Sequence, residues 1–316
     1  MPPLVAGMDR KAPPEKYNLL MHIPVLQKEV IDFLSPKPNE NLIDCTFGEG
    51  GHSLIILERI LPEGKILGID WDPEMISNFQ ERIKNSEKKD NFILVCDNFA
   101  NLKKIVEKNN LKADLILIDL GFSSWHLEDS KKGFSFKKQE PLDMRYNSRD
   151  SGLRARDVVN KFSQPEIEKI LREYGEERFA KKIASQIVKE RDKSPIESTT
   201  DLVEIIKKAT PPWYQKRKIH FATLTFQALR IFVNKEIENL QIVLSESLEA
   251  LNQKGRLAII SFHSLEDRIV KNFFKEKEYQ KIIKILTKKP ISPGEEEIKI
   301  NPRSRSAKLR VVEKKN

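Results

Sequence analysis

The sequence predicts an α/β protein in which a doubly wound sheet of about seven strands carries an inserted helical domain. Two observations support this fold class. Over roughly the first 120 residues, short and wholly apolar runs alternate with longer amphipathic segments, which is typical of parallel strands that are buried on both faces. From about residue 155 to residue 208 the pattern is helical throughout, and strand patterns return only afterwards. Alternating strands and helices indicate a parallel sheet with helical crossovers.

Four strands are expected before the helical stretch. Each is a short apolar run, and they are Asn41–Thr46, Lys65–Asp70, Phe92–Asp97 and Asp114–Leu120. Amphipathic helices are expected between and beside them, at Ser53–Ile60, Pro73–Lys84 and Asn101–Lys108. Together with the C-terminal part of the chain, residues 22–134 and 218–316 are predicted to form the sheet domain.

Residues 135–217 are predicted to form the helical insertion. The expected helices are Arg156–Phe162, Pro165–Tyr174, Glu177–Arg191 and Thr200–Lys208. Ser163, followed by Pro165 and Glu166, has the pattern of a helix start, with a capping hydroxyl, a proline and an acid in the first turn. No strand pattern of comparable quality interrupts these helices.

The sheet pattern resumes after the insertion. Residues 221–251 form one long amphipathic segment, and a wholly apolar strand is expected at 256–262. A helix is expected to start at Ser264 and to be capped by Ser264 and Asp267. Two late strands, at 281–287 and 307–313, are expected to pair as an antiparallel hairpin around a loop rich in Pro, Gly and Glu.

Charge and cysteine content exclude several classes of protein. The chain of 316 residues has a formal charge of +9, and the last 46 residues alone hold 14 Lys and Arg against 6 Asp and Glu. This localised charge indicates an anionic partner. Two cysteines in separate apolar runs provide neither a disulfide framework nor a zinc site, and we expect no metal. We expect a flexible tail at residues 1–21, no membrane segment and a cytoplasmic location.

A ligand site is expected where the strands end. The first strand leads into a glycine-rich turn, Gly48-Glu49-Gly50-Gly51, and acids end the next three strands, namely Asp70, Asp97 and Asp119. The carboxyl ends of parallel strands face one crevice, in which such an acid can accept the hydroxyls of a ribose. Each feature alone is also common in ordinary turns. Their occurrence in successive strands favours a bound ligand.

The cofactor class follows from the same turn. A nicotinamide cofactor requires three spaced glycines around its pyrophosphate, and the third glycine is missing here. S-adenosylmethionine has no phosphate, so an open loop and a ribose-binding acid are sufficient. The turn, Asp70 and the Asp97-Asn98-Phe99 segment fit S-adenosylmethionine better. A nicotinamide-dependent oxidoreductase remains the alternative.

Ten strings occur in order between His22 and about Lys314, among them D-C-T-F-G-E-G-G-H-S, G-I-D-W-D-P, D-L-G-F-S-S, P-L-D-M-R, T-F-Q-A-L-R-I-F-V-N-K-E, I-I-S-F-H-S-L-E-D-R-I-V-K and N-P-R-S-R-S-A-K-L-R. In these strings the chain resembles the bacterial 16S rRNA (cytosine-N(4))-methyltransferase family. The resemblance implies a class I methyltransferase sheet with a helical insertion. It also implies S-adenosylmethionine as the methyl donor and 16S rRNA as the partner, which we expect within the small ribosomal subunit, with naked rRNA as the alternative substrate.

The resemblance also implies which residues bind the cofactor. Carried over to this chain, they are Gly50, Gly51, His52, Asp70, Phe99, Asp119 and His126. His126 replaces a glutamine of the family, although an imidazole can still donate one hydrogen bond. The family string H-P-A-T-R-T-F-Q also differs here, because Phe221 and Leu224 replace the Pro and the Arg.

A proton acceptor is needed next to the amino group that is methylated. Asp119 is the first candidate, and His263 and Asp143 are the alternatives. Arg303, Arg305 and Lys308 are expected to bind RNA phosphates, in a loop apart from the catalytic crevice. A ribosome-assembly protein that binds RNA without catalysis is a further alternative. A DNA amino-methyltransferase is disfavoured, since residues 119–122 do not match its D/N-P-P-Y/F motif.

Overall fold

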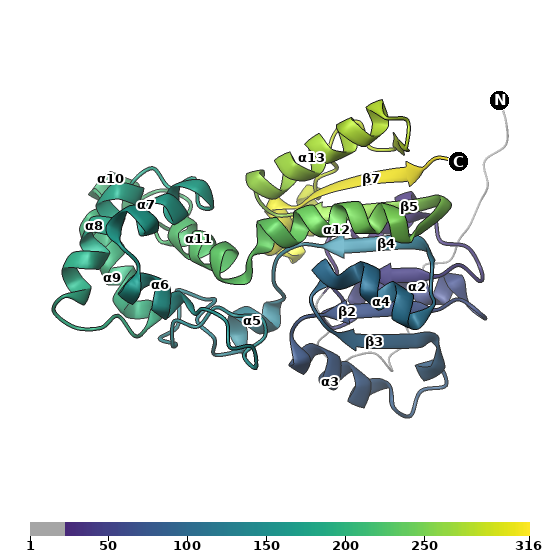
Figure 1. Ribbon diagram of the computed structural model, residues 1–316, viewed down its shortest axis with the longest axis horizontal. Coiled ribbons are helices and arrows are strands. Elements are labelled where there is room, and N and C mark those ends of the chain that lie inside the picture. Colours follow the sequence, from purple (N-terminus) through teal and green to yellow (C-terminus); the bar gives the residue numbers. More distant parts are fainter. Residues whose placement is uncertain (1–22) are drawn as a thin grey trace.

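The computed structural model describes residues 23–316, and the predicted N-terminal tail at residues 1–21 lies outside this range. A seven-stranded sheet forms the centre of one half, with the strand order β3-β2-β1-β4-β5-β7-β6 (Figure 1). The strands are β1 Leu42–Asp44, β2 Ile66–Asp70, β3 Phe92–Cys96, β4 Ala113–Asp119, β5 Leu251–Ser261, β6 Ile283–Ile285 and β7 Lys308–Lys314. The predicted α/β fold class and seven strands are confirmed, and the strand order is that of a class I methyltransferase sheet.

The first five strands of the sheet are parallel, as their buried apolar runs predicted. β1 pairs with β2 and β4, and β4 pairs with β5, all in parallel. β7 is antiparallel to both of its neighbours, β5 and β6. The late hairpin is therefore inserted into the sheet with its second strand against β5, so that β7 is a central strand.

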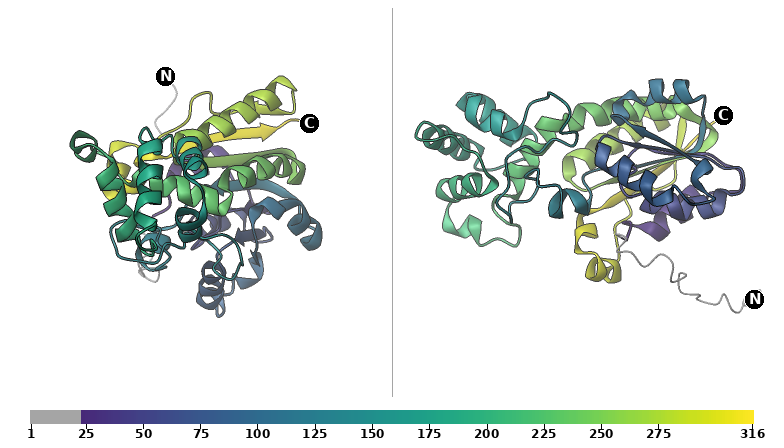
Figure 2. Two further views of the ribbon diagram at one scale, coloured as in Figure 1. Left: turned by 60° about the vertical axis from the view of Figure 1, so that its left-hand side comes forward. Right: turned by 90° about the horizontal axis from the view of Figure 1, so that it is seen from below.

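Helices cover both faces of this sheet. One face packs against α4 Leu102–Asn109, α12 Glu236–Ala250 and α13 Ser264–Tyr279. The other face packs against α1 Gln27–Leu34, α2 Gly51–Ile60 and α3 Pro73–Ile83. The two layers are seen edge-on in the right-hand view of Figure 2. Short 3-10 helices occur within residues 23–316 at η2 Lys89–Asn91, η3 Phe99–Asn101 and η4 Pro302–Ser306.

The inserted helices build a second core, which lies beside the sheet and not on it (Figure 1). They are α5 Ser124–Glu128, which leads into the insertion, then α6 Ala155–Lys161, α7 Gln164–Glu173, α8 Ala180–Arg191, α9 Thr199–Ala209 and α10 Pro212–Gln215. Their buried side chains form one cluster that continues into α11 Thr223–Asn234 through Phe226 and Leu229. The predicted start of α7 is correct, because Ser163 and Glu166 form a capping box.

The structure corrects three local predictions. The segment 221–251 is two helices, since Lys235 adopts a left-handed conformation with φ 52° between α11 and α12. The loop between the last two strands contains η4 and a short helix, α14 Glu295–Ile300, whose first turn holds three glutamates that suit a helix N-terminus. Finally, α13 is capped by His263 and Glu266, not by Ser264 and Asp267. No helix within residues 23–316 is long and apolar enough to cross a membrane.

Candidate active site

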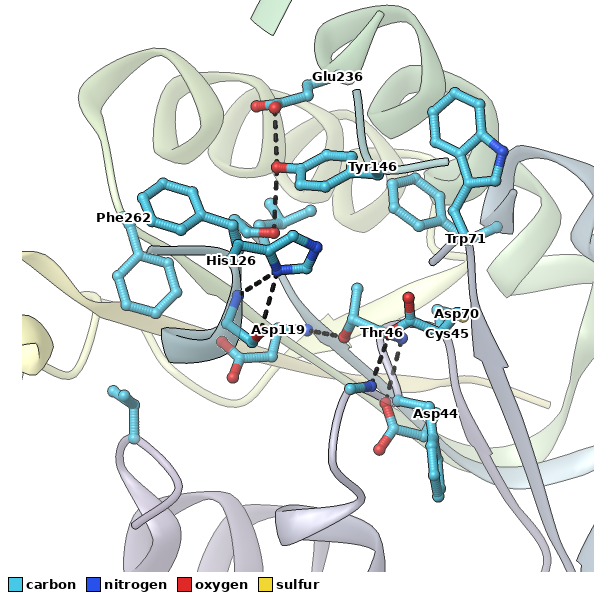
Figure 3. A pocket seen from close by; sticks show the side chains of 18 of the residues that line it. Asp44, Cys45, Thr46, Asp70, Trp71, Asp119, His126, Tyr146, Glu236 and Phe262 are labelled. Atoms are coloured by element: carbon cyan, nitrogen blue, oxygen red, sulfur yellow. Dashed lines mark hydrogen bonds between the residues drawn. The ribbon is translucent and has the colours of Figure 1, made fainter. Parts of the chain in front are cut away.

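A pocket lies at the carboxyl ends of β1, β2 and β4, where the sheet meets the insertion (Figure 3). Its lining falls into two groups. The loop after β1 and the ends of the strands line one side, and residues from the insertion and from α12 and α13 line the other. We call these the strand-end side and the insertion side. Parallel sheets place ligand sites at such an edge.

The glycine-rich loop on the strand-end side requires glycine for its shape. Gly50 has φ +74°, and a Cβ atom there would lie 2.6 Å from the ring of Phe79. Gly48 has φ +52°, and its N–H donates to Asp70 Oδ2 over 2.7 Å. Gly51 and His52 line the pocket, whereas Gly50 does not. The role that the structure shows for Gly50 is therefore to turn the loop.

Asp70 ends β2 and faces the pocket, as predicted. Its Oδ1 accepts the N–H of Asp72 over 2.8 Å, and Oδ2 accepts that of Gly48. Each oxygen has a second lone pair that can accept a hydroxyl hydrogen. Burial raises the pKa of Asp70 above its usual range. Phe99, from η3, lines the same side and offers an aromatic face.

Two buried titratable side chains, Asp44 and His52, line the pocket beside the loop after β1. Asp44 is buried, and it accepts hydrogen bonds from the Ser53 hydroxyl over 2.7 Å and from the Thr46 amide. Burial raises the pKa of Asp44 to about 6 and lowers that of His52 to about 4. His52 is therefore neutral at pH 7.

Asp119 ends β4 between the two sides of the pocket. Burial, and then the nearby carboxylates of Asp44 and Glu266, raise its pKa well above the usual range. Its Oδ2 lies 3.8 Å from His52 Nε2. Among residues 23–316, neither Asp119 Oδ1 nor His52 Nε2 has a hydrogen-bond partner. A buried carboxylate oxygen without a partner is costly, which points to a ligand that donates a hydrogen bond or carries positive charge.

Tyr146 lines the insertion side of the pocket. Its hydroxyl donates to Glu236 Oε1 over 2.9 Å, and its oxygen also lies 3.3 Å from the carbonyl of Gly121 (Figure 3). Both oxygens of Glu236 accept hydrogen bonds of 2.8 Å from Arg230, which is nearly buried. Burial alone would lower the pKa of Arg230, but Glu236 outweighs it and raises the pKa.

Asn234 connects the residues of the insertion side through hydrogen bonds. Its side chain donates to the carbonyl of Met144 over 2.7 Å and accepts from the N–H of Tyr146 over 3.0 Å. The loop that carries Tyr146 is thus joined to the junction of α11 and α12. Met144 and Lys235 both have positive φ, and such strained backbone is often found at functional sites.

His263 lies at the start of α13, next to the pocket lining. Its Nε2 is 3.1 Å from Glu266 Oε1, and Glu266 lines the pocket. Burial would raise the pKa of Glu266, but His263 and Arg230 outweigh it and lower the pKa. Glu236, His263 and Glu266 offer ligand atoms within 4.8 Å of one another. In this structure both oxygens of Glu236 accept hydrogen bonds from Arg230.

His126 lines the pocket but is also held by the protein. Its Nδ1 lies 2.9 Å from the hydroxyl of Ser123, and its Nε2 lies 3.2 Å from Asp72 Oδ2. Asp72 is fully buried and also binds Lys132 over 2.9 Å. Both ring nitrogens of His126 therefore contact protein groups, which ties α5 to the loop after β2.

The structure does not bring every predicted residue to the pocket. Asp143 is absent from the lining and binds Arg145 through two hydrogen bonds of 2.7 and 2.9 Å. Lys308 lies 3.3 Å from Asp267. Arg305 is exposed on η4, outside the pocket lining.

Arg303 corrects the expectation that the basic loop lies apart from the crevice. This residue lines the pocket and forms an ion pair with Glu128 at the end of α5. The C-terminal segment therefore forms part of the pocket rim. The reason is the direction of β7, which is antiparallel to β5: its first residue, Lys308, lies opposite Ser261 at the carboxyl end of β5, and η4 directly precedes it.

Several lining residues were missed by the sequence reasoning. They come from the insertion and from the helices that follow it: Tyr146, Asn234, Glu236 and Glu266. A signal for Asn234 and Glu236 was present, since both lie in the string T-F-Q-A-L-R-I-F-V-N-K-E, one of those by which the chain resembles its family.

Comparisons with known proteins agree with this geometry. The MraW methylase family model matches residues 19–315. A protein named ribosomal RNA small subunit methyltransferase H from Clostridium botulinum (strain Kyoto / Type A2) is 48% identical, covering 93% of this chain and 98% of its own length. Proteins of the same name from Heliobacterium mobile and Persephonella marina are 46% and 44% identical, over 93% and 94% of this chain and 98% and 100% of their own lengths. With a strand-end pocket of this form and these relatives, the chain belongs to the MraW methylase family.

Proposed function

We propose that this protein transfers a methyl group from S-adenosylmethionine to the exocyclic N4 amino nitrogen of a decoding-site cytidine in 16S rRNA. Family membership and the relatives named as small-subunit rRNA methyltransferases support the reaction and the substrate. The observation that carries the proposal is Asp119. Its carboxylate has an oxygen without a partner, and it stands between the strand-end side and the insertion side.

The strand-end side fits S-adenosylmethionine. Asp70 has free lone pairs for the ribose hydroxyls, Phe99 offers a face for adenine, and the glycine loop leaves room for the amino-acid end. When bound, this cofactor supplies a methyl group activated by a positively charged sulfur. Asp44 and Asp119 are suited to that charge, whereas they would repel the pyrophosphate of a nicotinamide cofactor.

Asp119 is proposed to act on the acceptor nitrogen. The lone pair of a cytosine amino group is delocalised into the ring, so the nitrogen is a weak nucleophile. In its ionised form, Asp119 can accept one N–H of this group and later take its proton. The raised pKa makes Asp119 a better proton acceptor than an ordinary aspartate. His52 stays neutral and does not compete for the proton.

The insertion side is proposed to hold the cytosine. The hydroxyl of Tyr146 donates its hydrogen bond to Glu236, so the hydroxyl oxygen can still accept a hydrogen bond from another group. The two sides then align donor and acceptor, which is the main requirement of an in-line transfer. Arg303 at the rim, with Arg305 and Lys308 nearby in the chain, is proposed to contact the phosphates that flank the base. Extrusion of the base from its stack would bring it to this depth.

The test is Asp119→Asn, assayed by transfer of labelled methyl to small ribosomal subunits and to deproteinised small-subunit rRNA. We expect kcat to fall by about 100-fold or more, with cofactor affinity by calorimetry changed less. Asp90→Asn is the control, because it makes the same chemical change at an exposed aspartate that does not line the pocket. Full turnover together with unchanged cofactor binding in Asp119→Asn would refute the role of Asp119. Mass spectrometry of rRNA nucleosides from cells lacking the gene tests the acceptor atom.

A further inference from the structure

The outer end of the insertion carries an exposed tryptophan surrounded by cations. Trp213, on the short helix α10, is 54% exposed. A single exposed aromatic side chain is common on protein surfaces, so the cations gathered around Trp213 are the informative feature. Helices α8 and α10 lie at the end of the molecule that is farthest from the sheet (Figure 1). This feature therefore lies outside the pocket described above.

The cations around Trp213 are held against aromatic rings. The guanidinium of Arg178 lies 5.4 Å from the centre of the Trp213 ring, and that of Arg217 lies 3.5 Å from the ring of Tyr214. The ammonium of Lys182 lies 5.9 Å from the ring of Phe179. Such cation–π contacts fix the direction of a cation without neutralising its charge. We call Arg178, Lys182, Trp213 and Arg217 the basic–aromatic surface.

This surface stands on a rigid base. Phe179, Trp213 and Tyr214 pack against one another with ring centres 4.7 to 5.8 Å apart. The hydroxyl of Tyr214 binds the buried carboxylate of Glu177 over 2.7 and 2.8 Å. The rings are therefore positioned before any partner arrives, which lowers the entropic cost of binding.

Over the part of the chain that the structure describes, the cations of this surface lack the acidic partners that several other cations of the insertion have. Among the described residues, none of Arg178, Lys182 and Arg217 forms an ion pair with a carboxylate. The same holds for the neighbouring exposed cations Lys181, Lys216 and Lys218. Several exposed cations elsewhere in the insertion do have acidic partners, as in Lys161–Asp157, Arg172–Glu168 and Lys193–Glu190. The positive charge around the exposed indole is thus not compensated by a carboxylate among residues 23–316, and here it gathers beside aromatic rings.

We propose that the basic–aromatic surface is a second RNA-binding site, which binds an unpaired stretch of small-subunit rRNA away from the methylated nucleotide. Arg178, Lys182 and Arg217 bind the phosphates, and a base stacks on Trp213. Stacking on an aromatic ring combined with backbone contacts by cations is the usual way in which proteins hold single-stranded nucleic acid. The inference rests on the proposed function, which supplies the RNA, and it adds where on the protein that RNA is held.

The experiment separates the phosphate contacts from the stacking contact. The triple variant Arg178→Gln/Lys182→Gln/Arg217→Gln is compared with Lys161→Gln/Arg172→Gln/Lys193→Gln, which removes the same charge from paired positions of the insertion. Binding to deproteinised small-subunit rRNA and to assembled small subunits is measured over a series of salt concentrations. For three lost contacts to a single strand, the slope of log K against log salt should fall by about 2. The control variant should keep the wild-type slope.

Trp213→Ala tests the stacking. Loss of one stacked base should weaken RNA binding by about tenfold or more, with the salt slope unchanged, and Trp213→Tyr should restore most of the affinity. In both test variants we expect KM for RNA to rise, while kcat at saturating RNA and cofactor affinity stay as in the wild type. Thermal unfolding checks that each variant is folded.

The outcomes separate this inference from the proposed function. If the wild-type protein methylates rRNA but the triple variant and its control lose equal affinity, only net charge matters and the surface is not a site. Unchanged affinity in Trp213→Ala overturns the stacking. A defect with assembled subunits that is absent with deproteinised rRNA shows a protein partner instead. If the wild-type protein does not methylate rRNA at all, the proposed function fails first.

Discussion

Replacing Asp44 by asparagine should make the protein more stable at pH 7. Asp44 is 2% exposed, and burial raises its pKa from the usual 3.8 to about 6. Below pH 4 the carboxyl is protonated in both the folded and the unfolded state. Between pH 4 and 6 only the folded state holds the proton, so the stability contributed by this group is lost as the pH rises. At pH 7 the fold has to bury an ionised carboxylate.

The size of the effect follows from the shift of about two pH units. One unit corresponds to about 1.4 kcal/mol, so the ionised Asp44 destabilises the fold by about 3 kcal/mol at pH 7. An asparagine can accept the Thr46 amide with its oxygen and donate to Ser53 with its nitrogen. The Ser53 hydroxyl then loses its acceptor, which costs about 1 kcal/mol. We expect a net gain of about 2 kcal/mol.

Urea unfolding between pH 4.5 and 7.5, without cofactor, measures this gain. The difference in free energy of unfolding between Asp44→Asn and wild type should grow from pH 4.5 to 6.5 and then level off. Asp90→Asn is the control, since Asp90 is exposed and makes no side-chain contact of this kind. If Asp44→Asn has the same pH dependence as wild type, the carboxyl titrates normally and the reasoning fails.

Three further results are expected. Arg230→Met should lower the free energy of unfolding in urea by about 3–5 kcal/mol, because it removes the cation that pairs with the largely buried Glu236. The double variant Arg230→Met/Glu236→Gln should recover much of that loss, and a double variant no more stable than the single one would contradict this explanation. Gly50→Ala should lower the stability by about 1–3 kcal/mol through its positive φ and its clash with Phe79, measured by thermal unfolding. Binding of S-adenosylmethionine should release protons and become tighter as the pH rises through the raised pKa values of Asp44 and Asp119, so the calorimetric heat at pH 6 should differ between buffers of different ionisation enthalpy.

The strands could be predicted because each one carries its own local signal. The strand Ala113–Asp119, for example, holds an unbroken apolar run from Leu115 to Ile118, since both of its faces are buried there. The place of β7 between β5 and β6 could not be predicted in this way, because strand order depends on contacts between distant segments. The left-handed Lys235 was missed for another reason: neither Gly nor Pro marks the break, and tertiary packing imposes it.

The same division holds for the site. Asp70 and Asp119 could be found because a strand end is a local feature with a fixed place in a parallel sheet. Tyr146 and Glu236 are 90 residues apart in the sequence and meet only through the fold. The capping of α13 by His263 was mistaken for capping by Ser264, since a serine is the commoner cap and the imidazole takes that role here only with Glu266 beside it.

The single residue between α11 and α12 has a mechanical consequence. Helix α11 is rooted in the core of the insertion through Phe226 and Leu229, and α12 is rooted in the core of the sheet through Leu240 and Val243. Only Lys235 separates the two helices, so the insertion cannot rotate relative to the sheet without displacing α12 from its packing on the sheet. A displacement of the outer helices would thus also move the insertion side of the pocket, which carries Tyr146. The insertion and the sheet domain should therefore unfold in one cooperative step.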